Sequence, residues 1–135
     1  MVWRIALTAL AVIHLLLGMW HGSAHARLAV ALSPAQNVFV YVVILLAPLV
    51  AVILLWTRYV KFALGLFLAA MSASLLFGLL YHYLIVSPDN IHHLAGGGAA
   101  SRARFTLSAA VLALVEGGSA VAAAFLLRQP TIFGS

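Results

Sequence analysis

The chain has 135 residues, of which 66% are apolar and only 7% are charged. Soluble domains carry about 45–50% apolar and about 25% charged residues, so a soluble enzyme, a disordered tail and a nucleic-acid-binding module are excluded. The net charge of +5 comes from scattered Lys and Arg residues, which form no patch that follows a phosphate backbone. Cysteine is absent, which also excludes disulfides, thiolate metal sites and iron–sulfur clusters.

Four stretches of the chain are apolar and long enough to cross a membrane, which takes about 20 residues per helix. They predict transmembrane helices over residues 2–20, with an extension to residue 32 left open, and over residues 34–56, 59–86 and 105–127. These helices use nearly the whole chain. We therefore expect residues 1–135 to form a single all-α domain, an antiparallel four-helix transmembrane bundle.

Helix boundaries carry recognisable signals. Ser33-Pro34-Ala35-Gln36 has the serine, proline and glutamine spacing of a capped helix start. Thr57-Arg58 leaves almost no linker, which predicts a tight hairpin between the second and third helices. Ser87-Pro88 is expected to begin a short extra helix, up to about Leu94, in the loop between the third and fourth helices. Pro48 predicts a kink inside the second helix.

Four crossings place both chain ends on one side of the membrane. Arg4, Arg58, Lys61 and Arg128 lie on that side, and Arg27, Arg102 and Arg104 lie on the other. By this small difference in basic residues, the positive-inside rule favours a cytoplasmic location for both chain ends. The membrane is expected to be a bacterial inner membrane or an equivalent one.

The first residues also allow a second interpretation. Arg4, the apolar run after it and Ala24-His25-Ala26 resemble a signal peptide with its cleavage site. Cleavage after Ala26 would remove three of the six histidines. A histidine at position 14 is unusual in a signal peptide, so we favour a retained first helix and leave the alternative open.

The histidines gather toward the membrane face opposite the chain ends. His14, His21 and His25 are separated by seven and four residues, which places them on one helical face. His82 lies near the end of the third helix. The remaining candidates lie in the predicted short helix and are Asp89, His92 and His93. Their i, i+3 and i+4 spacing would place them on one face of that helix.

This pattern predicts a transition-metal site. His21 and His25 offer two imidazoles from adjacent helical turns, as helical zinc sites do. Asp89 with His92 or His93 is expected to complete the site, with His82 as the next ligand. A sulfur-free His/Asp set suits Cu or Zn. The prediction is a metal-handling protein or accessory subunit, not an enzyme on its own, with its site on the extracytoplasmic face. The alternative is that these histidines only bond headgroups and water.

A different class of function remains open. His14 and His82 are placed to ligate a b-type haem or another tetrapyrrole between facing helices, as in an electron-transfer subunit. Gly18 and Gly78 lie one turn from these histidines and leave room for a flat macrocycle. A third interpretation is a non-catalytic structural subunit, because Ala120 to Ala124 forms a face of small residues. The expected partners are membrane lipid and other membrane subunits or further copies of the chain.

Glu116 is the only glutamate and lies well inside the fourth helix. A carboxylate at that depth is costly unless it is paired, so we expect it to face the bundle interior and to be protonated at least in part. By helical rise it lies near the level of His14, which makes a contact feasible. Glu116 would then orient a ligand imidazole or carry protons; the alternative is a plain hydrogen bond to a neighbouring helix.

Overall fold

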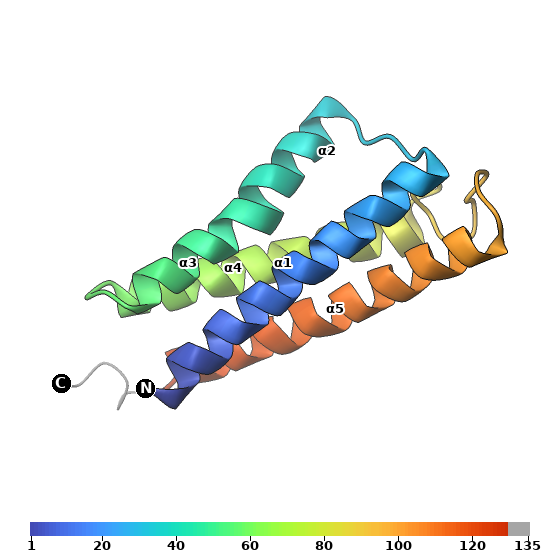
Figure 1. Cartoon of the computed structure of the whole chain (residues 1–135). Helices are drawn as coiled ribbons and strands as arrows, with labels where there is room; N and C mark the ends of the chain where they lie inside the picture. Colours follow the sequence, from blue (N-terminus) through green and yellow to red (C-terminus); the bar gives the residue numbers. More distant parts are fainter. Residues whose placement is uncertain (130–135) are drawn as a thin grey trace.

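The computed structural model describes residues 1–129, and it consists of four long helical segments (Figure 1). The first is α1 (Val2–Leu28) and the last is α5 (Ala99–Leu127). The second runs through α2 (Pro34–Phe39), the π-helix η1 (Val40–Leu46) and α3 (Ala47–Leu55), and the third through α4 (Val60–Leu79) and the π-helix η2 (Leu80–Leu84). All four are long and apolar enough to cross a membrane, which confirms the predicted fold class. Residues 130–135 of the predicted domain lie outside the described residues.

Several predicted boundaries are confirmed. Ser33 caps α2 through its hydroxyl, which accepts from the Gln36 amide, and the Gln36 side chain accepts from the Ser33 amide at 2.7 Å. Residues 56–59 form the tight connection between α3 and α4. The start of α1 and the end of α5 lie at the same end of the bundle (Figure 1). Residues 29–33 and 85–98 connect the helices at the opposite end, which we call the loop end.

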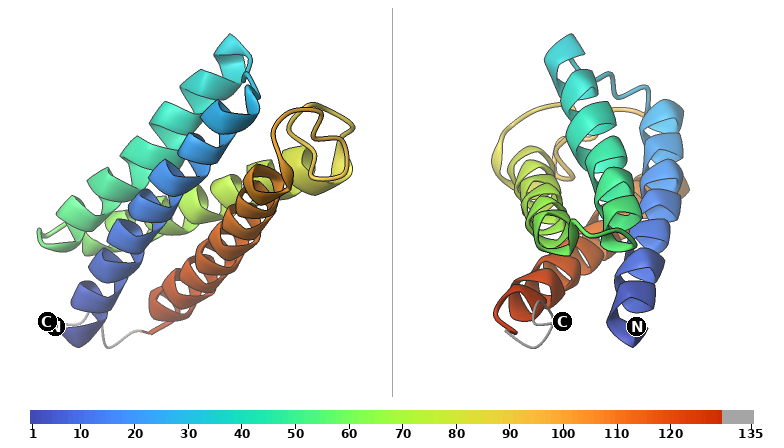
Figure 2. Two further views of the ribbon diagram at one scale, coloured as in Figure 1. Left: turned by 45° about the vertical axis from the view of Figure 1, so that its right-hand side comes forward. Right: turned by 90° about the vertical axis from the view of Figure 1, so that its left-hand side faces the viewer.

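The tightly packed part of the bundle is the half that holds the chain ends. There Leu7 of α1, Leu55 of α3 and Phe67 of α4 are at most 1% exposed. Toward the loop end, the second helical segment diverges from α4 (Figures 1 and 2). Neither α2 nor η1 contains a buried residue. The bundle is therefore closed at one end and open between helices at the other.

The helical irregularity expected at Pro48 takes the form of the π-helix η1, which ends at Leu46, two residues before the proline. Proline has no amide hydrogen, and its ring collides with the carbonyl four residues earlier, here that of Ile44. A π-helical turn widens the backbone at this place and relieves the collision.

The predicted short helix between Pro88 and Leu94 was wrong, because this loop forms turns instead. The Asn90 side chain donates to the Ile85 carbonyl at 2.9 Å and accepts from the His92 amide at 2.9 Å. The Ile91 amide donates to the His82 carbonyl at 3.0 Å. Such local bonds compete with helix formation. As a result, Asp89, His92 and His93 do not share a helical face.

Helix α5 begins at Ala99 rather than at residue 105, so Arg102 and Arg104 are helical. Arg102 donates to the Gly97 carbonyl at 2.8 Å. Arg104 reaches Ser23 at 3.1 Å and lies over the ring of Trp20. Long cationic side chains can thus lie at the border of an apolar segment while their charges reach polar partners.

Because the chain has no cysteine, single cysteines can report its topology. We expect a membrane-impermeant maleimide to label Ala95→Cys, at the loop end, in intact cells. Thr57→Cys, in the connection at the other end, should be labelled only after permeabilisation, because the charge bias favours that end as cytoplasmic. Both positions are exposed. Labelling of both variants in intact cells would contradict the bundle as a membrane-spanning unit, and the reverse pattern would invert its orientation.

Candidate metal centre

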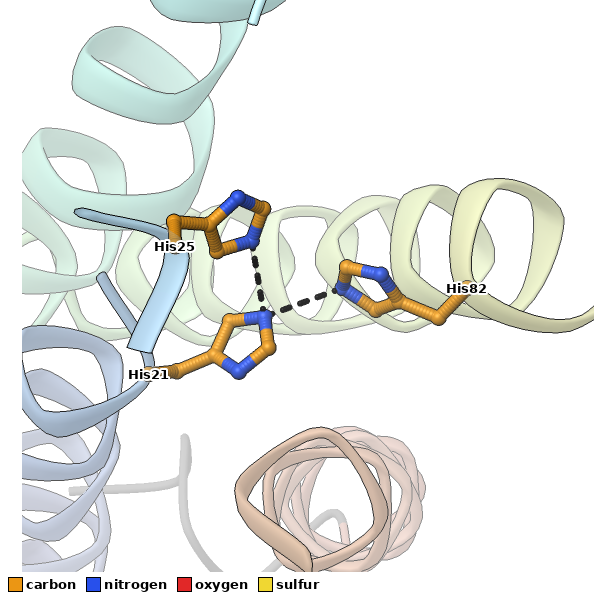
Figure 3. A group of neighbouring side chains, drawn as sticks. All are labelled: His21, His25 and His82. Atoms are coloured by element: carbon orange, nitrogen blue, oxygen red, sulfur yellow. Dashed lines mark hydrogen bonds between the residues drawn. The ribbon is translucent and has the colours of Figure 1, made fainter. Parts of the chain in front are cut away.

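Three histidines from two helical segments converge at the loop end of the bundle (Figure 3). His21 and His25 belong to α1, and His82 belongs to η2. Nε2 of His21 lies 3.1 Å from Nε2 of His25 and 3.1 Å from Nε2 of His82. One ligand atom from each ring lies within 4.8 Å of the other two. We call these three residues the histidine cluster.

Within the histidine cluster, the orientation of the His21 ring depends on a chain of hydrogen bonds from α5. Nδ1 of His21 lies 2.8 Å from the Ser108 hydroxyl oxygen, and that hydroxyl donates its one proton to the Phe105 carbonyl at 2.9 Å. Ser108 must therefore accept from His21, and Nδ1 of His21 carries a proton. In a neutral ring the other nitrogen, Nε2, then presents a lone pair toward the cluster.

The same argument applies to His82. Its Nδ1 lies 3.1 Å from the backbone carbonyl of Asp89, which can only accept. Nδ1 of His82 therefore donates, and Nε2 of the neutral ring carries a lone pair. His82 lies in the π-helical segment η2, and π-turns inside helices are frequent at functional sites.

Two lone pairs thus face each other across 3.1 Å, those of His21 and His82. This arrangement is repulsive unless a positive species lies between them, either a shared proton or a metal cation. His21 and His82 are each 7% exposed, so bulk water does not relieve the repulsion. The three histidines therefore form a group that could hold a metal ion.

His25 and Asp89 extend the centre. Oδ1 of Asp89 lies 3.3 Å from Nε2 of His25 and 3.3 Å from Nδ1 of His82. The carboxylate is buried, and neither of its oxygens has a hydrogen bond of good geometry to any of residues 1–129. Asp89 thus places a negative charge beside the histidines, where it favours a cation.

Phe105 forms an apolar side of the cluster. Its ring centroid lies 4.8 Å from that of His21, 4.9 Å from that of His25 and 5.3 Å from that of His82. Sequence reasoning missed both Phe105 and Ser108. A serine in an apolar helix is a weak signal, and nothing in the sequence aligns it with His21.

The structure brings together part of the predicted ligand set. His21, His25, His82 and Asp89 are adjacent, with His82 a central member rather than a secondary one. His92 and His93 are exposed in the loop and are not part of the cluster, because the helix that was expected to orient them does not form. Two histidines of the predicted set thus lie outside the centre.

The contact between His14 and Glu116 is present deeper in the bundle. Nε2 of His14 lies 3.0 Å from Oε1 of Glu116, and the two side chains are 1% and 6% exposed. The pair expected to ligate a haem, His14 and His82, therefore has protein partners at both Nε2 atoms.

Comparison with known proteins identifies no family model that matches this chain, no significantly similar curated protein and no significantly similar solved structure. The chemistry of the site therefore rests on its geometry alone.

A double-mutant cycle tests the His14–Glu116 contact. His14→Leu and Glu116→Leu should each lower the free energy of unfolding in detergent by about 1–3 kcal/mol, because each leaves a buried polar partner unpaired. The double variant should be more stable than the sum of the single effects predicts, by about 0.5–3 kcal/mol. Glu116→Gln keeps an acceptor and should cost less than Glu116→Leu. Strictly additive effects would mean that the two side chains do not interact in the membrane.

Proposed function

We propose that this membrane protein binds one transition-metal ion, zinc or copper, through the three Nε2 atoms of the histidine cluster. The observation that carries this proposal is the pair of opposed lone pairs on His21 and His82, held by hydrogen bonds to Ser108 and to the Asp89 carbonyl. A cation between these atoms converts their repulsion into two coordinate bonds.

Two of the three nitrogen–nitrogen distances are close to those of a tetrahedral ion, and the third, between His25 and His82, is within 4.8 Å. A zinc–nitrogen bond of about 2.0–2.1 Å places two ligand nitrogens of a tetrahedron about 3.3–3.4 Å apart. The two Nε2 separations of 3.1 Å need only a small expansion to reach this value. Imidazole without sulfur suits zinc and copper, and the Asp89 carboxylate offsets part of the ion's charge.

A metal ion accounts for the cluster better than a haem held by His14 and His82. Haem ligation would require His14 to leave Glu116, and that contact is buried. The visible spectrum of the purified protein compares the two proposals directly. A Soret band lost in His14→Ala would favour the haem.

The bound ion has one of two roles. In a metal-handling protein the ion exchanges with a donor or an acceptor, whereas in an accessory subunit it stays bound within a larger membrane complex. Native mass spectrometry in detergent distinguishes a chain that carries the metal alone from one that carries it within an assembly.

Metal analysis tests the proposal with a matched control. Protein purified without a histidine tag should contain about one zinc or copper ion per chain, which is the capacity of a single three-histidine site. The double variant His21→Ala/His25→Ala should lose that ion. His92→Ala/His93→Ala also removes two histidines, but these are exposed and outside the cluster, so its metal content should stay unchanged. A metal-free native protein, or loss of metal only in the control variant, would reject the site.

Ser108 offers a second test. Ser108→Ala removes the acceptor that holds His21 in position and should weaken metal binding about 10–100-fold, as loss of such supporting bonds does. Ser119→Ala is the control, because Ser119 is a fully buried serine of the same helix whose hydroxyl has no hydrogen bond within the part of the chain that the structure describes. Competition with a metal-sensitive dye measures both affinities. Equal affinity in the two variants would show that Ser108 does not orient His21.

A further inference from the structure

A cavity of about 480 Å³ lies between the diverging helices and reaches the histidine cluster. Its walls come from all four helical segments and are mainly apolar, with Leu45, Phe77 and Leu112 among the lining residues. Polar groups border it in two places, at the cluster with Asp89 and at Glu116. Ligand sites for small molecules have this size and this mixture of apolar walls with few polar groups.

Glycines keep this space open. Gly18 and Gly22 of α1 and Gly78 of α4 all line the cavity. Two glycines four residues apart, such as Gly18 and Gly22, usually let two helix backbones approach closely. Here an added Cβ would meet only side-chain atoms, at 3.7 Å for Gly18 and 3.8 Å for Gly78, and nothing within 4 Å for Gly22. These glycines therefore leave volume for something other than a packed helix.

The cavity also borders the outer surface of the bundle. Tyr41 of η1 lines it and is 65% exposed. The segment that carries Tyr41, Pro34–Leu55, is one of the four that can cross a membrane. A molecule dissolved in the lipid can therefore reach the cavity sideways, without passing through water.

We propose that this cavity binds a membrane-soluble molecule that has an apolar body and an oxygen-bearing head, with the head against the histidine cluster. An apolar body in this cavity gains van der Waals contacts with its apolar walls. A zinc ion held by these three histidines would supply a Lewis acid able to bind a hydroxyl or carbonyl oxygen. The placement of the head rests on the proposed metal site, but the binding of the apolar body does not.

Photolabelling in phosphatidylcholine vesicles tests this proposal with two probes, a diazirine-bearing hexadecanol and the matching diazirine-bearing hexadecane. The alcohol should label residues that line the cavity, such as Leu45 and Phe77, about tenfold more than the alkane does, because only the alcohol has a head for the cluster. In the double variant His21→Ala/His25→Ala, labelling by the alcohol should fall to the level of labelling by the alkane. Labelling by the alkane should stay the same.

A filled cavity provides the control. Gly18→Leu should reduce labelling by both probes about tenfold, because the added side chain occupies the ligand's volume. Gly65→Leu is the matched variant: Gly65 is also a helical glycine with open space around it, but it does not line the cavity, so labelling should be unchanged. Metal content is measured in each sample, so that a failure of the metal site is read separately. Equal labelling by alcohol and alkane in native metal-loaded protein, or unchanged labelling in Gly18→Leu, would overturn the proposal.

Discussion

The hydrocarbon interior of a membrane offers no water, so a polar group inside this bundle is costly unless it finds a partner within the protein. This constraint explains most of the polar contacts described above. His14 lies against Glu116, His21 bonds Ser108, and Ser108 in turn bonds the Phe105 carbonyl. The first two contacts join α1 to α5 and therefore also specify how these two helices are rotated against each other. The same bonds decide which nitrogen of His21 faces the cluster.

The loop between η2 and α5 completes the site because it folds back on His82. The Asp89 carbonyl accepts from His82, while the Asp89 carboxylate lies beside His25. Asn90 holds this loop in place through the Ile85 carbonyl and the His92 amide. A helix over these residues would satisfy their backbone internally and would remove the carbonyl that His82 needs. The turns that replaced the expected helix are therefore part of the centre.

The histidine cluster lies in the open half of the bundle. The second helical segment packs near the chain ends and then diverges, which leaves the histidine cluster beside a cavity rather than inside a closed core. A tightly packed bundle would bury the cluster against side chains and leave no route to it from the lipid. Stability comes from the packed half around Phe67, and access to the proposed metal comes from the open half.

The sequence by itself determined the four membrane-crossing helices, because length and apolar composition are local properties of each segment. It also predicted the capped start at Ser33, the tight turn at Thr57 and the closeness in depth of His14 and Glu116, which follow from short-range spacing and helical rise. Only the tertiary structure decided that His82 joins His21 and His25 and that His92 and His93 do not. Those choices depend on the π-turn of η2, the side-chain bonds of Asn90 and the rotation of α5 that brings Ser108 to His21. The bond between His21 and Ser108 joins segments that are far apart in the sequence, so no local pattern encodes it.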